Sequence, residues 1–239
     1  MRRSTARRSG GAERAVALVS GGLDSTVSLA AAAQRVEVVA AVTVRYGQRA
    51  ETEEVKAARR IAKALGVRHR VISLPWLGRL GTGALLDPSS TVPTVRASDL
   101  TAGRAREASK AVWVPNRNGL LVNVAACLAE AWGAGVVVAG FNREEAAHFP
   151  DNGPEFVRAV NRALRWSTSN AIRVVSYVQD MTKREMVETG SRLGAPLDAL
   201  YSCYVGGPLH CGRCESCVRL AQAFRAAGKW RVLQHRFAR

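Results

Sequence analysis

Apolar and polar positions divide most of the chain into short strand-like runs and longer helix-like stretches. Nearly uninterrupted apolar runs, typical of strands buried on both faces, lie at residues 15–19, 36–44, 69–74, 135–139 and 172–178. Apolar residues three and four apart predict helices that end at residue 33, cover 51–65, pass through 121–132 and 156–164, and end near 193. Thr182 with Glu185 predicts a capping box for the last of these. The alternation predicts an α/β fold with a Rossmann-like, doubly wound parallel sheet.

The remaining stretches flank or interrupt this sheet. Residues 1–13 are small, polar and Arg-rich, and are expected to form a disordered tail. The sheet domain is expected over residues 14–200, followed by a C-terminal segment, 201–239, that carries four cysteines. Glycines and prolines interrupt any periodicity between residues 76 and 112. This predicts a long irregular insertion, and long loops of this kind in α/β domains often act as lids.

Composition narrows the choice of partner. The chain has 239 residues, 47% of them hydrophobic, and 35 Lys+Arg against 19 Asp+Glu give a formal charge of +16. Five arginines less one glutamate give +4 before residue 15, and six basic residues without an acid give +6 over residues 218–239. An acidic partner is therefore expected: phosphate, nucleic acid or an anionic surface. No apolar run approaches the ~18 residues that cross a bilayer, so we expect a cytoplasmic protein without a membrane partner.

A glycine-containing loop follows the first apolar run. It reads Val19-Ser20-Gly21-Gly22-Leu23-Asp24-Ser25-Thr26 and leads into a helical pattern. Adjacent glycines allow close backbone approach, three hydroxyls supply donors, and the helix N-terminus attracts anions. The loop lacks the Gly-Lys-Ser/Thr of a Walker P-loop and the third glycine of a dinucleotide-binding fingerprint. It therefore predicts a phosphate site at the carboxyl edge of the sheet, with little support for γ-phosphate or hydride transfer.

The string Ser-Gly-Gly-x-Asp-Ser after a buried first strand resembles the pyrophosphate loop of the N-type ATP pyrophosphatases, the PP-loop superfamily. The resemblance implies an adenine nucleotide alpha hydrolase-like fold and adenylation, in which a substrate oxygen attacks the α-phosphate and pyrophosphate leaves into the loop. It implies that residues 19–26 bind ATP and that Ser20, Asp24 and Ser25 are catalytic. Asp24 either holds Mg²⁺ or caps the helix.

Four of the five cysteines fall within 15 residues near the C-terminus, as Cys203-x7-Cys211-x2-Cys214-x2-Cys217. Four thiolates form a closed tetrahedral Zn²⁺ site, so we expect one structural zinc ion per chain. An iron–sulfur cluster is less favoured, because the bacterial ferredoxin spacing would place a further cysteine where Ala221 stands. The fifth cysteine, Cys127, is expected to be a small core residue on a helix.

A PP-loop near the N-terminus combined with a four-cysteine site near the C-terminus resembles the QueC family, over roughly residues 14 to 226. Further matches are Tyr46-Gly47-Gln48-Arg49, Val114-Pro115-Asn116-Arg117-Asn118, Gly140, Phe149-Pro150-Asp151, and Lys183. The resemblance implies a carbon–nitrogen ligase of queuosine biosynthesis. Such an enzyme converts 7-carboxy-7-deazaguanine and ammonia to 7-cyano-7-deazaguanine, with ATP activating first the carboxylate and then the amide. A homodimer is also implied.

Three basic residues are expected to stabilise charge on the α-phosphate as pyrophosphate departs: Arg49, Arg117 and Lys183. Arg117 and Lys183 are expected to be catalytic, and Arg49 and Gly140 to contact ATP.

The matching motifs also predict a substrate pocket. Tyr46 and Gln48 are expected to line it, and Phe149 is expected to be an exposed aromatic that stacks on the purine-like ring. Asp151 or Glu145 would accept from the N1–H and the exocyclic amine of the guanine-like edge.

The sequence departs from the family pattern in three of the motifs. Ala50 stands where histidine is common, Asn116 where glycine is frequent, and Asn152-Gly153 where Cys-Arg is usual. The last change removes a thiol and a guanidinium from the expected substrate segment. A relative that stops at the amide, or that activates another carboxylate, therefore stays open. A PP-loop tRNA-modifying enzyme is a further alternative, with nucleic acid as its partner and the Arg-rich ends on phosphates.

Overall fold

A computed structural model describes residues 12–81, 83–101 and 103–238. Most of the predicted N-terminal tail lies outside the described residues. Glu13, at its end, already belongs to the folded part, because its carbonyl accepts from the Glu37 amide at 2.9 Å and its carboxylate pairs with Arg173 at 2.6 Å.

All five expected strands form, and they pair in parallel in the order β3-β2-β1-β4-β5. Their bounds are β1 Arg14–Leu18, β2 Glu37–Arg45, β3 His69–Ser73, β4 Val136–Ala139 and β5 Arg173–Ser176. β1 pairs with β4 through Ala15–Val136, Val16–Val137 and Ala17–Val138. From β1 the chain builds the sheet outward through β2 and β3 on one side, and then returns to add β4 and β5 on the other side of β1. The switch point of the sheet therefore lies between β1 and β4.

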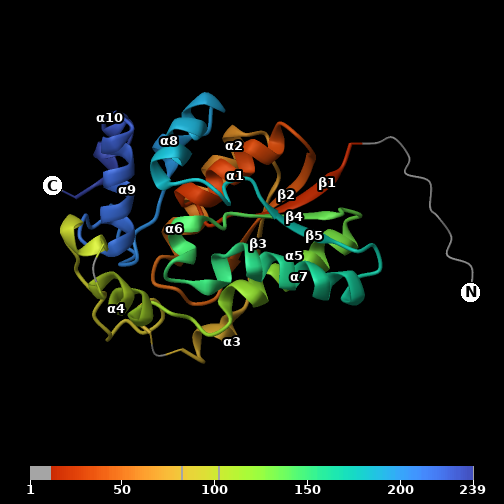
Figure 1. The fold of residues 1–239 in the computed structure, drawn as a ribbon, viewed down its shortest axis with the longest axis horizontal. Coiled ribbons are helices and arrows are strands. Elements are labelled where there is room, and N and C mark those ends of the chain that lie inside the picture. The colour runs from red at the N-terminus through yellow and green to blue at the C-terminus, as the bar shows by residue number, and fades with distance from the viewer. Residues whose placement is uncertain (1–11, 82, 102, 239) are drawn as a thin grey trace, which may run out of the picture.

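Helices cover both faces of the sheet, which confirms the doubly wound prediction (Figure 1). One face packs on α1 Leu23–Ala33, α2 Glu51–Ala64 and α8 Lys183–Arg192, and the other on α5 Arg117–Ala131 and α7 Pro154–Ser167. Successive strand residues alternate between the two cores: Ala17 and Val138 belong to the first, Val16 and Val137 to the second. The predicted capping box at Thr182 and Glu185 is present at the start of α8.

The C-terminal segment lies beyond the carboxyl ends of the strands (Figure 1). It contains α9 Glu215–Ala226, α10 Trp230–Leu233 and η4 Gln234–Arg236, and η3 Leu197–Ala199 directly precedes it. α9 packs against α8, and Leu220 and Phe224 join the core on the α1 face. In the described part of the chain, no helix has the length and apolar character that a bilayer span requires.

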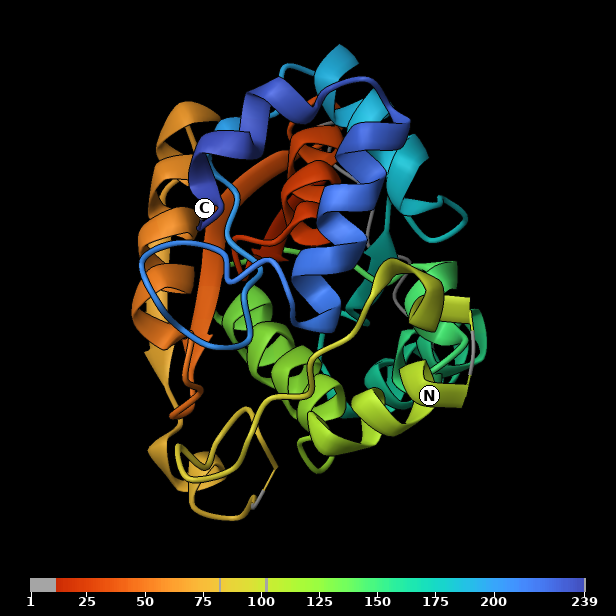
Figure 2. The ribbon, with the colours of Figure 1, turned by 90° about the vertical axis from the view of Figure 1, so that its left-hand side faces the viewer.

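The insertion over residues 76–112 is more regular than predicted. It includes α3 Pro75–Gly78, η1 Ala97–Thr101 and α4 Gly103–Ala111. α4 escaped prediction because its sequence, GRAREASKA, has small and charged residues without an apolar stripe. Figure 2 shows η1 and α4 at the same end of the molecule as α9, and Val95, Leu100 and Ala108 pack there against Val218.

Two shorter helices follow β4: α6 Arg143–Ala146 and η2 Pro150–Asn152. Cys127 is exposed, so its prediction as a core residue was wrong. The buried face of α5 consists of Val122, Ala125, Ala126 and Ala129, and Cys127, the residue after Ala126, points away from this face.

Candidate active site

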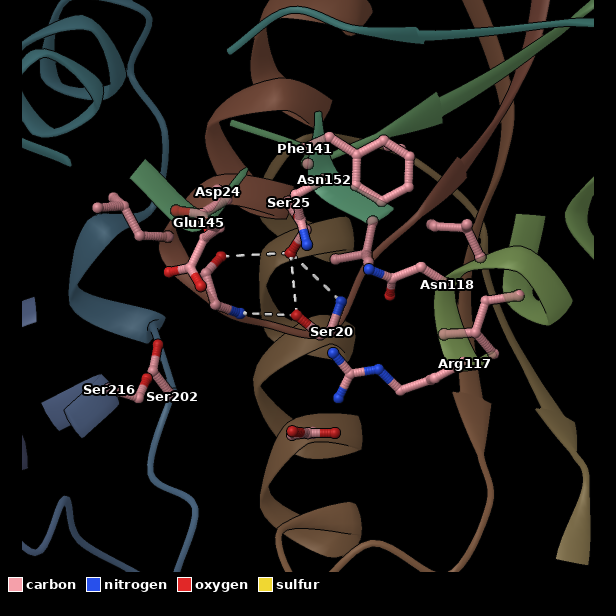
Figure 3. Close-up of a pocket in the computed structure, with 18 of the residues that line it drawn as sticks. Ser20, Asp24, Ser25, Arg117, Asn118, Phe141, Glu145, Asn152, Ser202 and Ser216 are labelled. Atoms are coloured by element: carbon pink, nitrogen blue, oxygen red, sulfur yellow. Dashed lines mark hydrogen bonds between the residues drawn. The ribbon is translucent and has the colours of Figure 1, made fainter. Parts of the chain in front are cut away.

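The loop between β1 and α1 is compact because two glycines let other segments press against it. Gly21 has φ +89°, a conformation that favours glycine, and a Cβ there would lie 2.8 Å from the Ala57 Cβ of α2. A Cβ on Gly140, just after β4, would lie 2.6 Å from the Ser25 amide nitrogen. The Ser25 hydroxyl lies 3.3 Å from both the Ser20 amide and the Ser20 hydroxyl (Figure 3). The hydroxyls of the loop therefore gather at the switch point of the sheet.

A cavity of about 280 Å³ opens at this point. Figure 3 shows Arg117 and Asn118 on one side of the loop and Ser202 and Ser216 on the other. Most residues predicted for the site line this cavity: Val19, Ser20, Gly22, Leu23, Asp24, Ser25, Tyr46, Gln48, Arg117, Gly140, Glu145, Phe149 and Lys183. The topology thus brings together the segments that follow β1, β2 and β4 with residues of α1, α5, α6 and α8.

Lys183, at the start of α8, sits between two carboxylates. Its Nζ lies 2.6 Å from Asp24 Oδ2 and 2.8 Å from Glu145 Oε1, and its side chain is only 13% exposed. The Asn142 amide also donates to Asp24 Oδ2, at 3.1 Å. Burial would lower the pKa of Lys183, but the two carboxylates raise it above its ordinary value. Lys183 is therefore cationic, and with the two carboxylates it forms a group of formal charge −1.

The two carboxylates differ in protonation behaviour. Burial raises the pKa of Asp24, and Lys183 opposes this only in part. Burial also acts to raise the pKa of Glu145, but Lys183 outweighs it and the net shift is downward.

Arg117 occupies the opposite wall of the cavity. Its Nη1 lies 3.5 Å from the Tyr46 hydroxyl, and none of the described carboxylates comes within 4.0 Å of its guanidinium. Burial would lower the pKa of Arg117, but Tyr46 and more distant anionic groups raise it above its ordinary value. The preceding residue, Asn116, has φ 49° and ψ 29°, a left-handed conformation that asparagine adopts more readily than most side chains. Asparagine thus preserves the backbone turn where the family often has glycine.

Four predicted residues do not line the cavity: Gly21, Thr26, Arg49 and Asp151. Gly21 is the loop residue that packs against α2, and Thr26 is fully buried in α1. The Arg49 guanidinium donates to the carbonyls of Ala84 at 3.3 Å and Ser90 at 2.9 Å, so it holds the insertion instead of facing the loop.

Aromatic side chains close one end of the cavity. Phe149 is 8% exposed, so the expectation of an exposed ring was wrong, although the ring does line the cavity. It stacks on Trp113 at 6.1 Å between centroids and 8° between planes, and Trp113 is 40% exposed. Trp113, which directly follows the insertion, thereby covers Phe149 from solvent. Tyr46 is also buried, which raises the pKa of its hydroxyl despite the nearby Arg117.

Sequence reasoning missed several polar and aromatic residues of the cavity: Thr43, Glu54, Asn118, Phe141, Asn152, Tyr201, Ser202, Tyr204, Ser216 and Arg219. Most of the last five lie between or beside the cysteines, where the metal pattern was the only signal considered. The Tyr201 amide donates to the Gly21 carbonyl at 2.9 Å, so the cysteine segment packs directly on the loop.

The four cysteines of the C-terminal segment form one cluster. Their sulfur atoms all lie within 4.8 Å of one another, and Cys211 and Cys217 are 3.9 Å apart. A tetrahedral ion with Zn–S bonds of about 2.3 Å requires sulfurs about 3.8 Å apart, so the cluster fits a metal. The amides of Cys211 and Cys214 donate to the sulfurs of Cys203 and Cys211 at 3.4 and 3.3 Å. Hydrogen bonds from the three other thiols lower the pKa of Cys211 far below its ordinary value.

Comparison with known proteins places the chain in a family. Residues 14–228 match the family described as "Queuosine biosynthesis protein QueC". The chain is 49% identical over 216 residues to the 7-cyano-7-deazaguanine synthase of Pelotomaculum thermopropionicum, covering 90% of this chain and 98% of that protein. It is 40% identical over 219 residues to the enzyme of the same name from Methanosarcina mazei, covering 90% and 95%.

Among solved structures, the chain is similar to the U34-tRNA thiolase NcsA from Methanococcus maripaludis, with 12% identity, a TM-score of 0.49, and 94% of this chain and 74% of that chain covered. At this TM-score the similarity supports no inference about function. Family membership follows instead from the match over most of the chain and from the high identity to full-length relatives: this chain belongs to the QueC family.

Proposed function

We propose that this chain converts 7-carboxy-7-deazaguanine and ammonia to 7-cyano-7-deazaguanine at the expense of two ATP molecules, as a carbon–nitrogen ligase. The observation that carries the proposal is the cavity at the switch point of the sheet. There the Ser20–Ser25 loop faces two cations in a chain that is up to 49% identical to proteins named 7-cyano-7-deazaguanine synthase.

The proposed chemistry follows from the poor leaving groups of the substrates. A carboxylate oxygen attacks the α-phosphorus of ATP, a new P–O bond forms, and pyrophosphate leaves. Ammonia then adds to the acyl carbon and AMP departs, giving the amide and a proton. In the second cycle the amide oxygen attacks a second α-phosphorus, pyrophosphate leaves again, and loss of AMP and the amide protons gives the nitrile. Both cycles require groups that stabilise negative charge at the α-phosphate.

The loop and Arg117 would stabilise that charge. The hydroxyls of Ser20 and Ser25 and the backbone of Gly22 line the cavity next to the N-terminus of α1, which suits departing pyrophosphate. Arg117 has no carboxylate partner within 4.0 Å among the described residues, so its guanidinium is available to a phosphate or carboxylate oxygen.

The Asp24–Lys183–Glu145 group would hold the metal that accompanies ATP. Its net charge of −1 and its hard oxygen donors suit Mg²⁺, which coordinates one or two carboxylates together with phosphate oxygens. Bound there, Mg²⁺ would neutralise phosphate charge. Lys183 would orient both carboxylates and supply a positive charge beside them.

The substrate ring would lie toward Phe149 and Tyr46, which give the cavity its aromatic end. Of the two carboxylates predicted for the guanine-like edge, Glu145 lines the cavity and Asp151 does not. Gln48 donates to Glu54 at 2.8 Å and accepts from the Tyr46 amide at 2.9 Å, so it would position Tyr46 rather than read the ring itself.

The cysteine cluster would hold one Zn²⁺ ion. All four sulfurs come from protein ligands, which leaves no open position, so the ion would stabilise the C-terminal segment and take no part in the reaction. We further propose a cytoplasmic homodimer with free ammonia as nitrogen donor, on the basis of the family alone.

The decisive experiment incubates the protein with ATP, Mg²⁺, ammonium and 7-carboxy-7-deazaguanine and identifies the products by mass. The nitrile is expected, with two AMP released per nitrile, and none without ATP or ammonium. Asn152 lines the cavity where the family usually has cysteine, which favours one second candidate, an enzyme that stops at the amide. Amide as the only product would support that candidate, and no product would contradict both.

Nucleic acid is the second partner to test, because of the +16 charge. A gel shift with bulk tRNA at physiological salt is expected to show only weak, salt-sensitive binding. Tight binding there would favour a tRNA-modifying enzyme.

A further inference from the structure

A third cation lines the cavity, on the side of the cysteine cluster. Ser216, Arg219 and Leu220 project from one face of α9 into the cavity wall. The same helix carries the cluster, since Cys214 is its N-cap residue and Cys217 lies in its first turn. The first turn of α9 therefore has a metal-binding face and a cavity face.

Arg219 is paired with a buried acid. Its Nε donates to Glu215 Oε1 at 2.9 Å, and the two side chains are 14% and 6% exposed. Burying a carboxylate is costly unless it is paired, and Glu215 has Arg219 as its partner one helical turn away. Glu215 directly follows Cys214, so metal ligands before and after it fix the backbone from which it reaches Arg219.

The pair leaves donors unused. Arg219 Nη2 is buried and makes no hydrogen bond to any described residue, and Glu215 Oε2 is in the same state. A guanidinium has five N–H donors, of which this ion pair uses one. Lys183, by contrast, is already shared by two carboxylates.

The location of Arg219 suggests what it binds. The segment that precedes the cluster lies against the phosphate loop: a Cβ on Gly22 would be 3.4 Å from the Ser202 hydroxyl, and Gly21 accepts from the Tyr201 amide. The α9 wall is thus next to the place proposed for departing pyrophosphate.

We propose that Arg219 binds an anionic oxygen of a substrate in this cavity, and that Glu215, anchored between two cluster cysteines, positions its guanidinium. The oxygen belongs either to the phosphates of ATP, which the adjoining loop favours, or to the carboxylate of the acid substrate. The inference rests on the proposed function and extends it, because it assigns the cysteine segment a part in ligand binding.

The test compares Arg219→Gln, Glu215→Gln and a matched control, Arg184→Gln. Arg184 makes the same contact to Glu188 one turn away on α8, Nε to Oε1 at 2.8 Å, but its side chain is 62% exposed. Calorimetry measures the binding of pyrophosphate and AMP, steady-state kinetics gives the KM of the acid substrate, and metal content and melting temperature report on the fold.

Arg219→Gln is expected to weaken pyrophosphate binding about tenfold or more, the loss of one charged hydrogen bond, with AMP binding little changed. Glu215→Gln is expected to show a smaller loss of the same kind, because a glutamine oxygen still accepts from Nε. Arg184→Gln should bind as wild type. Metal content near one per chain in every variant would exclude a merely structural effect.

The outcomes separate the two proposals. If the KM of the acid rises about tenfold while pyrophosphate binding holds, the anion is the carboxylate and Arg219 still binds substrate. If wild type binds and turns over both substrates and Arg219→Gln does so equally well, the Arg219 assignment is overturned and the proposed function stands. If wild type binds neither ATP nor pyrophosphate, the proposed function itself fails.

Discussion

Lys183 and Arg117 face the same cavity from opposite walls, but their surroundings differ. Lys183 makes two ion pairs, with Asp24 and Glu145, both at 2.8 Å or less. The guanidinium of Arg117 has a phenol 3.5 Å away and no ion pair among the described residues. One cation is already neutralised by the protein, and the other is not.

The difference assigns different roles to residues that look alike in the sequence. A lysine between two carboxylates forms a group of formal charge −1, which attracts a divalent cation and repels a bare phosphate. An arginine without an acid partner attracts phosphate and carboxylate oxygens directly. The Lys183 wall should therefore set Mg²⁺ dependence, and the Arg117 wall should set affinity for substrate anions.

The largest effect is expected from Asp24→Ala. The change removes one of two carboxylates on Lys183 and with it the net negative charge of the group. We expect kcat/KM to fall by roughly 1000-fold, comparable to losing a major electrostatic contribution to catalysis, with fold and metal content retained. The measurement is AMP release at saturating Mg²⁺, with exposed Asp180→Ala as control. Turnover close to that of wild type would refute the adenylation assignment.

Arg117→Gln should have the next largest effect. If Arg117 contacts the α-phosphate as proposed, its loss should lower kcat/KM about 100-fold, and Arg117→Lys should recover part of it because the charge remains while the planar fork is lost. Steady-state kinetics at several Mg²⁺ concentrations would measure both variants. The Mg²⁺ requirement should shift for Asp24→Ala and stay constant for Arg117→Gln. The reverse pattern would invert the assignment of the two walls.

The sequence predicted the Lys183 wall and the loop better than the rest of the site. The loop, the five strands and the capping box of α8 depend on neighbouring residues, so local patterns were sufficient. The ion pair between Lys183 and Asp24 joins residues 159 positions apart. Only the strand order brings them together, and no local pattern contains it.

The insertion and the C-terminal segment were harder to predict. Arg49 follows β2 as a phosphate-binding residue would, but its guanidinium is taken up by carbonyls of the insertion, whose path has no periodic signal. Arg219 was not predicted for the site, because the cysteine spacing predicts a metal site and says nothing of which helix face meets the cavity. The family resemblance located the site, and the packing decided which residues enter it.

A smaller effect is expected where the backbone turns into α5. Asn116 has a left-handed conformation, φ 49°, and a side chain other than asparagine or glycine is strained there by about 1 kcal/mol. Asn116→Ala should lower the melting temperature by about 2–4 °C and weaken binding at the adjoining Arg117 without changing the Mg²⁺ requirement. Asn116→Gly should remain close to wild type. Equal stability of both variants would mean that the turn is not strained.

The smallest effect is expected from Glu54→Gln, on the Arg117 wall. Burial holds the pKa of Glu54 above its ordinary value of 4.5, and the hydrogen bond from Gln48 and the charge of Arg117 offset this only in part. The folded protein therefore binds this proton more tightly than the unfolded chain does, and ionisation reduces stability as pH rises through the folded pKa. At pH values below the pKa of Glu54 in the unfolded chain, the carboxyl is neutral in both states, and this loss of stability is absent.

Glu54→Gln should consequently raise the melting temperature at pH 8, by about 2 °C, and leave it unchanged near pH 4. Thermal unfolding at the two pH values, with Glu53→Gln on the same helix as control, measures the difference. If Arg117 formed an ion pair with Glu54, ionisation of Glu54 would instead stabilise the fold, and the variant would melt below wild type at pH 8. A lowered melting temperature would therefore contradict the contrast between the two walls, because Arg117 would then be neutralised much as Lys183 is.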